Sequence, residues 1–275
     1  MKILIVCSGN VEDFNLILHH AFIYEQIESI KHSFNIEYDV FYIKGKGITG
    51  YLSNLRKFNN KIKSFNPDVV HAHFGLSGLL ACLQRKSPVV ITFHGSDVNQ
   101  KKIRPLSRLA ARLSDYSIFV SDKILKKIKV KTRASVIPCG INIDVFYPVE
   151  KKIAREKLNM VLEKKFILFS GNFEREVKNS SLAFSAMGRL KMDCELIELK
   201  SKTRQEVNLL LNACNLLLLT SISEGSPQVI KEAMACNCPI VATDVGDIRE
   251  VIGDTEGCYL TSFDPDDIAQ KITLA

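Results

Sequence analysis

The sequence predicts an α/β protein made of two doubly wound domains, each a parallel sheet covered by helices on both faces. Short apolar β-rich segments alternate with amphipathic helical segments along nearly all of the 275 residues. Apolar strands that alternate with helices are typical of parallel sheets buried on both sides. The stretch PCGINIDVFYPVEKK (138–152) has two prolines and no periodicity, so we expect it to connect two such sheets.

Six strands are expected in the first half and five in the second. The first six are KILIVC (2–7), DVFYI (39–43), DVVHAH (68–73), PVVITF (88–93), YSIFV (116–120) and SVIP (135–138). The other five are FILFS (166–170), CELIEL (194–199), NLLLLT (215–220), PIVAT (239–243) and CYLT (258–261). Helical sequence separates them, for example at 17–31, 51–65, 203–213 and 227–236. We expect the two domains to face each other across a cleft, with sites at the carboxyl ends of the strands.

Composition excludes several classes of protein. The length suffices for two domains with their own cores, and a hydrophobic fraction of 46% fits a globular protein. The eight cysteines form no C-x-x-C pair and several lie in apolar segments, so we interpret them as reduced thiols of a cytoplasmic protein. The apolar start MKILIVCSGN is too short for a signal sequence or a membrane span.

The two halves differ in charge. Residues 1–150 carry 21 Lys and Arg against 12 Asp and Glu, whereas residues 151–275 carry 16 against 18. A solvated helix face and contact with an anionic membrane or phosphate-bearing acceptor both explain the basic half. Nucleic acid is not an expected partner, because no aromatic residues are interleaved with the charges. The two basic runs are Lys101, Lys102, Arg104, Arg108 and Arg112, then Lys123, Lys126, Lys127, Lys129, Lys131 and Arg133.

Residues 45–50, GKGITG, match the glycine pattern of dinucleotide-binding sites, with Asp68 about twenty residues further on. The pattern follows the second strand rather than the first. We therefore favour a flexible loop near an acceptor over a nicotinamide or flavin site.

The segment SEGSPQVIKEAMA (223–235) predicts an anion site at a helix start. Ser226 suits the N-cap and Pro227 the first helical position, which leaves the N–H groups of the next three residues free to bind phosphate. Glu224 and Glu232 would repel that phosphate unless they face neutral groups such as sugar hydroxyls. Arg175 and Lys178, in SGNFEREVKNSSLAF (170–184), would compensate the phosphate charge from another strand-to-helix loop.

The ordered landmarks of the chain resemble those of the retaining glycosyltransferases of family 4, with their E-x7-E motif. In the second half these are GNFEREVKN (171–179) and the run from Ser223 to Gly246. In the first half they are PDVVHAHFG (67–75), ITFHGSDV (91–98), YSIFVSD (116–122) and VIPCGINIDVFYP (136–148). The resemblance implies a GT-B fold with an acceptor-side domain at 1–148 and a nucleotide-sugar domain at 149–275.

The same resemblance assigns roles to individual residues. It places Glu232 on the donor ribose, Glu224 beside the transferred sugar and Lys178 on the diphosphate. His94 of the HGSD motif would reach the reacting sugar. The remaining donor-binding assignments are Gly9 in the first-strand loop, Arg175, and the turn of Gly225, Ser226, Pro227, Gln228 and Val229.

Two features depart from the family pattern. Asn172 stands where many members carry arginine after the glycine, and Arg175 is expected to substitute for it. The chain ends at DDIAQKITLA, whereas members continue with a further helix, so we expect the second domain to lack its final helix.

Several polar residues have structural alternatives. Of His71 and His73, we expect one to point into the sheet packing and the other to the edge of the cleft. Asp97 either caps a helix or belongs to the site. Cys236 and Cys238 lack partners for a zinc shell, so no metal site is expected.

Together these features predict a hexosyltransferase that moves a hexose from a nucleotide-diphosphate sugar to a glycan or lipid-linked acceptor. We expect it to retain anomeric configuration, to need no metal or other cofactor, and to serve bacterial surface polysaccharide synthesis at the inner face of the membrane. The alternative is a donor-binding, catalytically weak partner subunit or truncated enzyme. A non-hydrolysing nucleotide-sugar epimerase shares the expected fold but not the run of landmarks.

Overall fold

The computed structural model describes residues 1–130 and 133–275. Lys131, assigned above to the second basic run, lies outside these residues. The chain divides into two compact units, Met1–Cys139 and Gly140–Ala275. The predicted connector begins at this division, and its Phe146 is buried in the core of the second unit.

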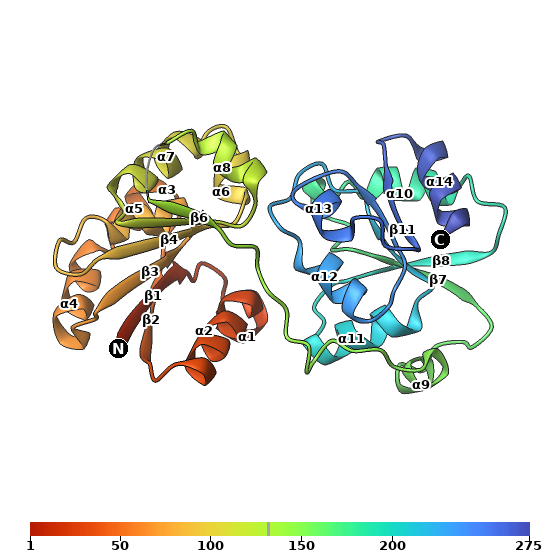
Figure 1. The fold of residues 1–275 in the computed structure, drawn as a ribbon, viewed down its shortest axis with the longest axis horizontal. Coiled ribbons are helices and arrows are strands. Elements are labelled where there is room, and N and C mark those ends of the chain that lie inside the picture. The colour runs from red at the N-terminus through yellow and green to blue at the C-terminus, as the bar shows by residue number, and fades with distance from the viewer. Residues whose placement is uncertain (131–132) are drawn as a thin grey trace. The chain divides into compact units, whose positions relative to one another are not determined.

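The first unit is built on a six-stranded parallel sheet with the order β2-β1-β3-β4-β5-β6 (Figure 1). Each strand lies within two residues of its predicted limits. The prediction of a parallel sheet is therefore confirmed for this unit. Its strands are β1 (Lys2–Ser8), β2 (Glu37–Ile43), β3 (Val69–His73), β4 (Val89–Phe93), β5 (Tyr116–Phe119) and β6 (Ala134–Val136).

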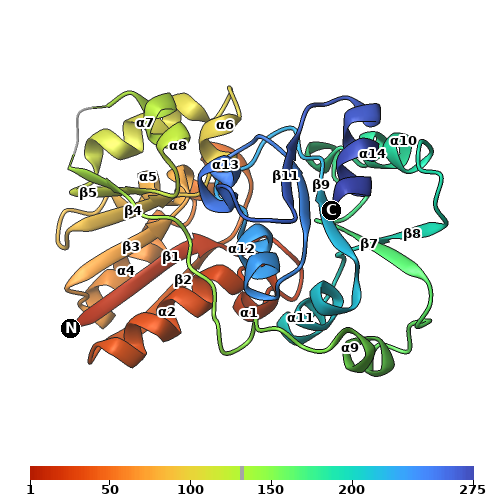
Figure 2. The ribbon, with the colours of Figure 1, turned by 45° about the vertical axis from the view of Figure 1, so that its right-hand side comes forward.

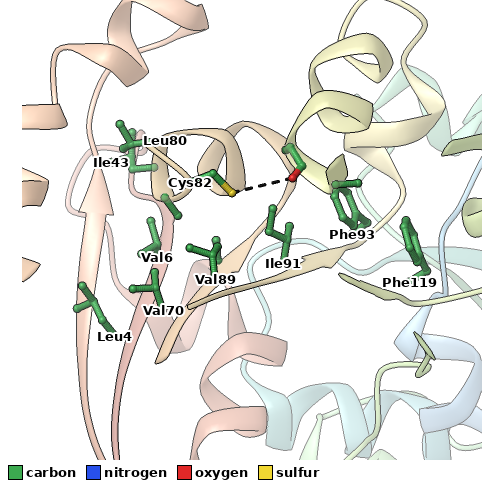
Figure 3. Packing of buried hydrophobic residues seen from close by; sticks show 14 of the residues in the cluster. Leu4, Val6, Ile43, Val70, Leu80, Cys82, Val89, Ile91, Phe93 and Phe119 are labelled. Carbon is green, nitrogen blue, oxygen red and sulfur yellow. Dashed lines mark hydrogen bonds between the residues drawn. The ribbon is translucent and has the colours of Figure 1, made fainter. Parts of the chain in front are cut away.

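Side chains alternate between the two faces of β1, and each face has its own helices. Leu4 and Val6 enter a core closed by α4, α5, α7 and α8, whereas Ile3, Ile5 and Cys7 pack against α1 and α2. Figure 3 shows the first of these cores, where Val6, Val70 and Ile91 come from neighbouring strands. The helices are α1 (Leu16–His19), α2 (Ala21–Ser33), α3 (Gly47–Leu52), α4 (Leu55–Phe65), α5 (Gly75–Ala81), α6 (Ser96–Asn99), α7 (Arg104–Leu113) and α8 (Asp122–Ile128).

The helix predicted at 17–31 is interrupted. It is divided at His20, whose φ of −138° and ψ of 52° are not helical. The Asn15 side chain accepts from the backbone N–H groups of Ile17 and Leu18 and so begins the short first piece.

The second unit has a five-stranded parallel sheet with the order β11-β10-β9-β7-β8 (Figure 2). The strands are β7 (Lys165–Phe169), β8 (Cys194–Glu198), β9 (Leu216–Leu219), β10 (Ile240–Thr243) and β11 (Cys258–Thr261). One face packs against α11, α12 and α13 and the other against α10 and α14. The helices are α9 (Lys151–Lys157), the 3-10 turn η1 (Glu176–Lys178), α10 (Ser180–Met187), α11 (Arg204–Ala213), α12 (Gln228–Ala235), α13 (Ile248–Ile252) and α14 (Pro265–Leu274).

Both sheets reverse their strand order beside their first strand. In the first unit the reversal lies between β1 and β3, and in the second between β7 and β9. Loops at such a reversal leave in opposite directions over the sheet, which opens a crevice at the carboxyl ends of the two strands. The loops after β7 and β9 are therefore where a ligand site is expected in the second unit.

Candidate active site

The loops after β7 and β9 bring Lys178 and Glu224 into contact. The Lys178 ammonium donates to Glu224 Oε1 at 2.8 Å, and the Ser221 hydroxyl donates to the same oxygen at 2.8 Å. The side chains of Lys178 and Glu224 are only 11% and 18% exposed. Glu224 thus faces a cation rather than neutral groups alone, which corrects the expectation that it needs sugar hydroxyls to tolerate a nearby phosphate.

Hydrogen bonds to backbone carbonyls hold these two loops together. The buried Thr220 hydroxyl donates to the carbonyls of Lys178 and Asn179 at 2.9 and 3.0 Å, and the Ile222 N–H donates to the Val177 carbonyl at 2.9 Å. The stem of Lys178 lies over Gly171, where an added Cβ would meet it at 3.0 Å. The position of the ammonium is therefore fixed by the strand ends themselves.

The turn before α12 differs from its predicted capping. Helix α12 begins at Gln228, and Pro227, with ψ of 114°, is the last residue before it rather than its first. The Ser226 hydroxyl does not cap the helix but donates to Asp247 Oδ2 at 2.6 Å and accepts from the Lys231 ammonium at 2.7 Å. The helix starts one residue later than predicted, which moves Ser226 out of the N-cap position.

The N–H groups at this helix start are partly used. The Ile230 N–H donates to the Pro227 carbonyl at 3.2 Å, so it is not free as predicted. The Gln228 side chain donates to the Gly140 carbonyl at 2.7 Å, and Val229 packs against the core of the unit.

Gly225 lies against the loop after β10, where the sequence predicted no site residue. Gly246, after β10, has φ of +61°, and a Cβ on it would stand 2.6 Å from the Gly225 carbonyl oxygen. Asp247 in this loop is 7% exposed, and burial raises the pKa of its carboxyl. Two loops therefore shape the turn, and only glycine fits their closest approach.

Glu232, on the second turn of α12, is also paired with a cation. It is 2% exposed, and its Oε1 lies 2.8 Å from Arg204 Nη2. The Arg204 guanidinium is centred 4.5 Å from the Phe146 ring. Arg204 was not predicted from the sequence. A cation in the first turn of a helix is unusual because it opposes the helix dipole, and this placement is a signal that could have pointed to Arg204.

Arg175 is exposed at the start of η1, and its side chain makes no ion pair within the described residues. Its neighbour Asn172 accepts from the Glu174 N–H at 2.8 Å, so this stretch is organised by local contacts. Whether Arg175 substitutes for the family arginine stays a prediction.

In the first unit, three histidines form a stack at the ends of β3 and β4. His73 Nδ1 lies 3.0 Å from His94 Nε2, and the ring centroids of His71 and His73 are 4.5 Å apart. The expectation that His71 and His73 point in different directions is wrong, because residues two apart on a strand share a face. His71 is held by Thr92 Oγ1 at 2.8 Å.

Burial keeps the histidine stack uncharged. It lowers the pKa of His71 to about 4 and that of His94 to about 3, and lowers that of His73 further below its ordinary value. The rings of Phe22 and Phe74 pack on His94, with centroids at 4.7 and 4.8 Å. His94 is therefore suited to hydrogen bonding as a neutral imidazole near pH 7.

Asp97 contacts the start of α5, which precedes it in the chain, whereas the sequence offered a cap of the following helix as the structural alternative. Its carboxylate accepts from the N–H of Gly75, at the start of α5, and from the N–H of Gly95, both at 2.9 Å. Burial raises the pKa of its carboxyl to about 6. Asp97 thereby ties the loops after β3 and β4, which carry His73 and His94.

Gly9 and the glycine-rich loop lie side by side. The buried Gly9 donates its N–H to the Ile43 carbonyl at 2.9 Å and accepts from the Lys44 ammonium at 2.6 Å. Asn10 exchanges hydrogen bonds with Gly45 at 2.6 and 2.9 Å. A Cβ on Gly50 would stand 2.6 Å from the Gly45 carbonyl carbon, so close backbone approach accounts for these two glycines.

Among the described residues, no group of three or more His, Cys, Asp and Glu side chains could hold a metal ion. Within the same residues, no helix is both long and apolar enough to cross a membrane.

Two family profiles match the chain. Residues 22–145 match Glycosyltransferase Family 4, and residues 193–274 match Glycosyl transferases group 1. An uncharacterized glycosyltransferase of Methanocaldococcus jannaschii is 28% identical over 92% of this chain and 78% of its own length. A putative teichuronic acid biosynthesis glycosyltransferase of Bacillus subtilis is 28% identical over 78% of this chain and 62% of its own length.

Solved structures share the fold. A sucrose-phosphate synthase from Thermosynechococcus elongatus superposes with a TM-score of 0.85 at 16% identity, over 99% of this chain and 88% of that one. HepE of Anabaena, solved in complex with UDP, superposes with a TM-score of 0.73 at 16% identity, over 99% of this chain and 89% of that one. These similarities and the two parallel sheets confirm the predicted GT-B fold.

Proposed function

We propose that this chain, which belongs to the family 4 glycosyltransferases, moves a hexose from a nucleotide-diphosphate sugar to a glycan or lipid-linked acceptor with retention at the anomeric carbon. The observation that carries the proposal is the pairing of Lys178 with Glu224 at the point where the strand order reverses. Relatives named for teichuronic acid and colanic acid biosynthesis support a role in surface polysaccharide synthesis. The neighbour solved with UDP supports a nucleotide-sugar donor.

In this proposal the diphosphate binds beside Lys178 and the start of α12. The Gln228 and Val229 N–H groups and the Lys178 ammonium would stabilise negative charge as it develops on the leaving diphosphate. Arg175 would add a third positive group from the exposed end of its loop. Diphosphate binding would draw the ammonium away from Glu224 and leave that carboxylate for the transferred sugar.

His94 and Glu232 would act on other parts of the substrates. A neutral His94 would hydrogen-bond the reacting sugar, and the buried Glu232 carboxylate would accept from the donor ribose hydroxyls. The chemistry requires no metal in this scheme, because fixed cations and backbone N–H groups compensate the diphosphate. Loss of transfer in EDTA that manganese restores would contradict this part of the proposal.

Calorimetry with UDP separates the roles of the two glutamates, because UDP has the ribose but no transferred sugar. Glu232→Ala should weaken UDP binding, whereas Glu224→Ala should bind UDP nearly normally and lose about 10²-fold or more in the rate of transfer. Equal loss of UDP binding in both variants would mean that the carboxylates are wrongly assigned. Binding of UDP-sugars without transfer or hydrolysis by the wild-type chain would indicate a donor-binding subunit instead.

Peripheral contact with an anionic membrane on the cytoplasmic side is the proposed location. Some residues of the basic runs make internal contacts: Arg104 donates to the Val98 carbonyl, Arg108 to the Ile128 carbonyl and Lys127 to Asn99. The exposed remainder includes Lys101, Lys102, Arg112, Lys126, Lys129 and Arg133. Each cation near such a surface contributes about 1 kcal/mol. Equal sedimentation with neutral and anionic vesicles would refute this contact.

A further inference from the structure

Arg204 stands at an unfavourable place for a cation. It is the first residue of α11, whose start is fixed by the capping box of Thr203 and Glu206. A positive charge in the first turn opposes the helix dipole. Nearby anions compensate such a charge, and Glu232 is one that lies within ion-pair distance of Arg204.

The Arg204 guanidinium contacts both the Glu232 carboxylate and the Phe146 ring. Its Nη2 lies 2.8 Å from Glu232 Oε1, and its centre lies 4.5 Å from the Phe146 ring, which is 1% exposed. A guanidinium over an aromatic face is attracted to that ring, which restricts where its charge can lie. The capped helix and the buried ring thus fix the line along which Arg204 meets the carboxylate.

The neighbouring cation is engaged elsewhere. Lys231 precedes Glu232 in α12, but its ammonium donates to Ser226 and lies 3.7 Å from Asp247. Glu232 has a side chain only 3% exposed, and a buried carboxylate requires a charged or hydrogen-bonding partner. Arg204 supplies such a partner from a different helix.

We propose that Arg204 is a positioning residue, which holds the Glu232 carboxylate in the orientation that receives the two vicinal hydroxyls of a ribose. This inference rests on the proposed function, in which Glu232 binds the donor ribose. Accepting two adjacent hydroxyls at once requires a fixed carboxylate plane, whereas accepting one does not. Arg204 would therefore govern the preference for ribose over 2′-deoxyribose.

Calorimetry with UDP and 2′-deoxy-UDP tests this role in the full-length chain. Arg204→Met keeps the length of the stem but removes the charge and the planar group. We expect UDP to bind it roughly 10- to 100-fold more weakly, as for loss of a hydrogen bond to a charged group, and the preference for UDP over 2′-deoxy-UDP to disappear. Arg204→Lys restores the charge without the plane, so it should regain part of the affinity.

The matched control is Arg189→Met, which removes an arginine from an exposed ion pair with Asp266 on the other face of the sheet. It should leave both affinities unchanged. Unchanged UDP binding by Arg204→Met, or weaker binding with the preference for UDP preserved, would overturn the positioning role and leave Arg204 a structural residue.

Failure of the proposed function would look different. In that case the wild-type chain would bind neither UDP, GDP nor ADP, or would bind UDP and 2′-deoxy-UDP equally. Either result would remove the ribose contact of Glu232, and the role of Arg204 with it. A wild-type preference for UDP that Arg204→Met retains would refute the positioning role alone.

Discussion

The Lys178→Met variant tests whether the lysine stabilises the unliganded site through Glu224. Methionine keeps most of the apolar stem that packs over Gly171, so the substitution removes chiefly the ammonium. The Glu224 carboxylate would keep the Ser221 hydroxyl at 2.8 Å but lose its cation. A half-buried carboxylate that loses its charged partner is destabilising.

The expected size follows from the burial of the pair. Removing one partner of a fully buried ion pair costs about 3–5 kcal/mol, and a hydrogen bond to a charged group contributes about 1.5–3 kcal/mol. Because the two side chains are 11% and 18% exposed, solvent screens part of the charge, and we expect about 2 kcal/mol. For a unit of this size the loss lowers the melting temperature by about 4–8 °C.

Differential scanning calorimetry of the single variants Lys178→Met and Glu224→Gln and of the double variant measures the coupling. Glutamine removes the charge while keeping the shape, so the double variant should be more stable than the sum of the single losses predicts, by about 1–2 kcal/mol. Additive losses, within about 0.5 kcal/mol, would refute the reasoning that the ion pair stabilises this site.

Two further predictions concern the loops and the histidine stack. Gly246→Ala should destabilise the second unit by about 2–4 kcal/mol in urea unfolding, because its Cβ would stand 2.6 Å from the Gly225 carbonyl oxygen at φ of +61°. Gly257→Ala, also in the second unit, has φ of +77° and meets nothing closer than 3.7 Å, so it should cost only about 1 kcal/mol; equal costs would contradict the steric argument. Burial lowers the pKa of His71 from 6.5 to about 4, so the unfolded chain binds more protons between these values and the first unit should lose stability as pH falls from about 6.5 to 4. Burial raises the pKa of Asp97 to about 6, so protonation of this carboxyl stabilises the folded state as the pH falls and offsets part of the loss caused by His71. The free energy of unfolding, measured by urea titration at each pH, should therefore fall on acidification. A steady rise instead would show that the histidine does not dominate.

The sequence by itself determined the two sheets. Continuous apolar runs such as LLLL at 216–219 and IVAT at 240–243 are buried on both faces whatever packs on them, so they predict parallel strands from local composition alone. The order of the landmarks also indicated the resemblance to family 4 glycosyltransferases, and two glycosyltransferase profiles match residues 22–145 and 193–274. The residues of the candidate site that follow strands, such as His94 and Lys178, could be assigned to strand ends for the same reason.

Only the tertiary structure decided which charges meet. Lys178 and Glu224 lie in loops after β7 and β9, and they pair because these strands are neighbours in the sheet although β8 separates them in the sequence. Arg204 and Glu232 come from two helices on one face of that sheet. A sequence pattern gives the facing of side chains within one element, but contacts between elements depend on strand order and on the closest approach of loops. The sequence therefore predicted both glutamates and Lys178, whereas only the fold showed that Lys178 pairs with Glu224 and that Arg204 pairs with Glu232.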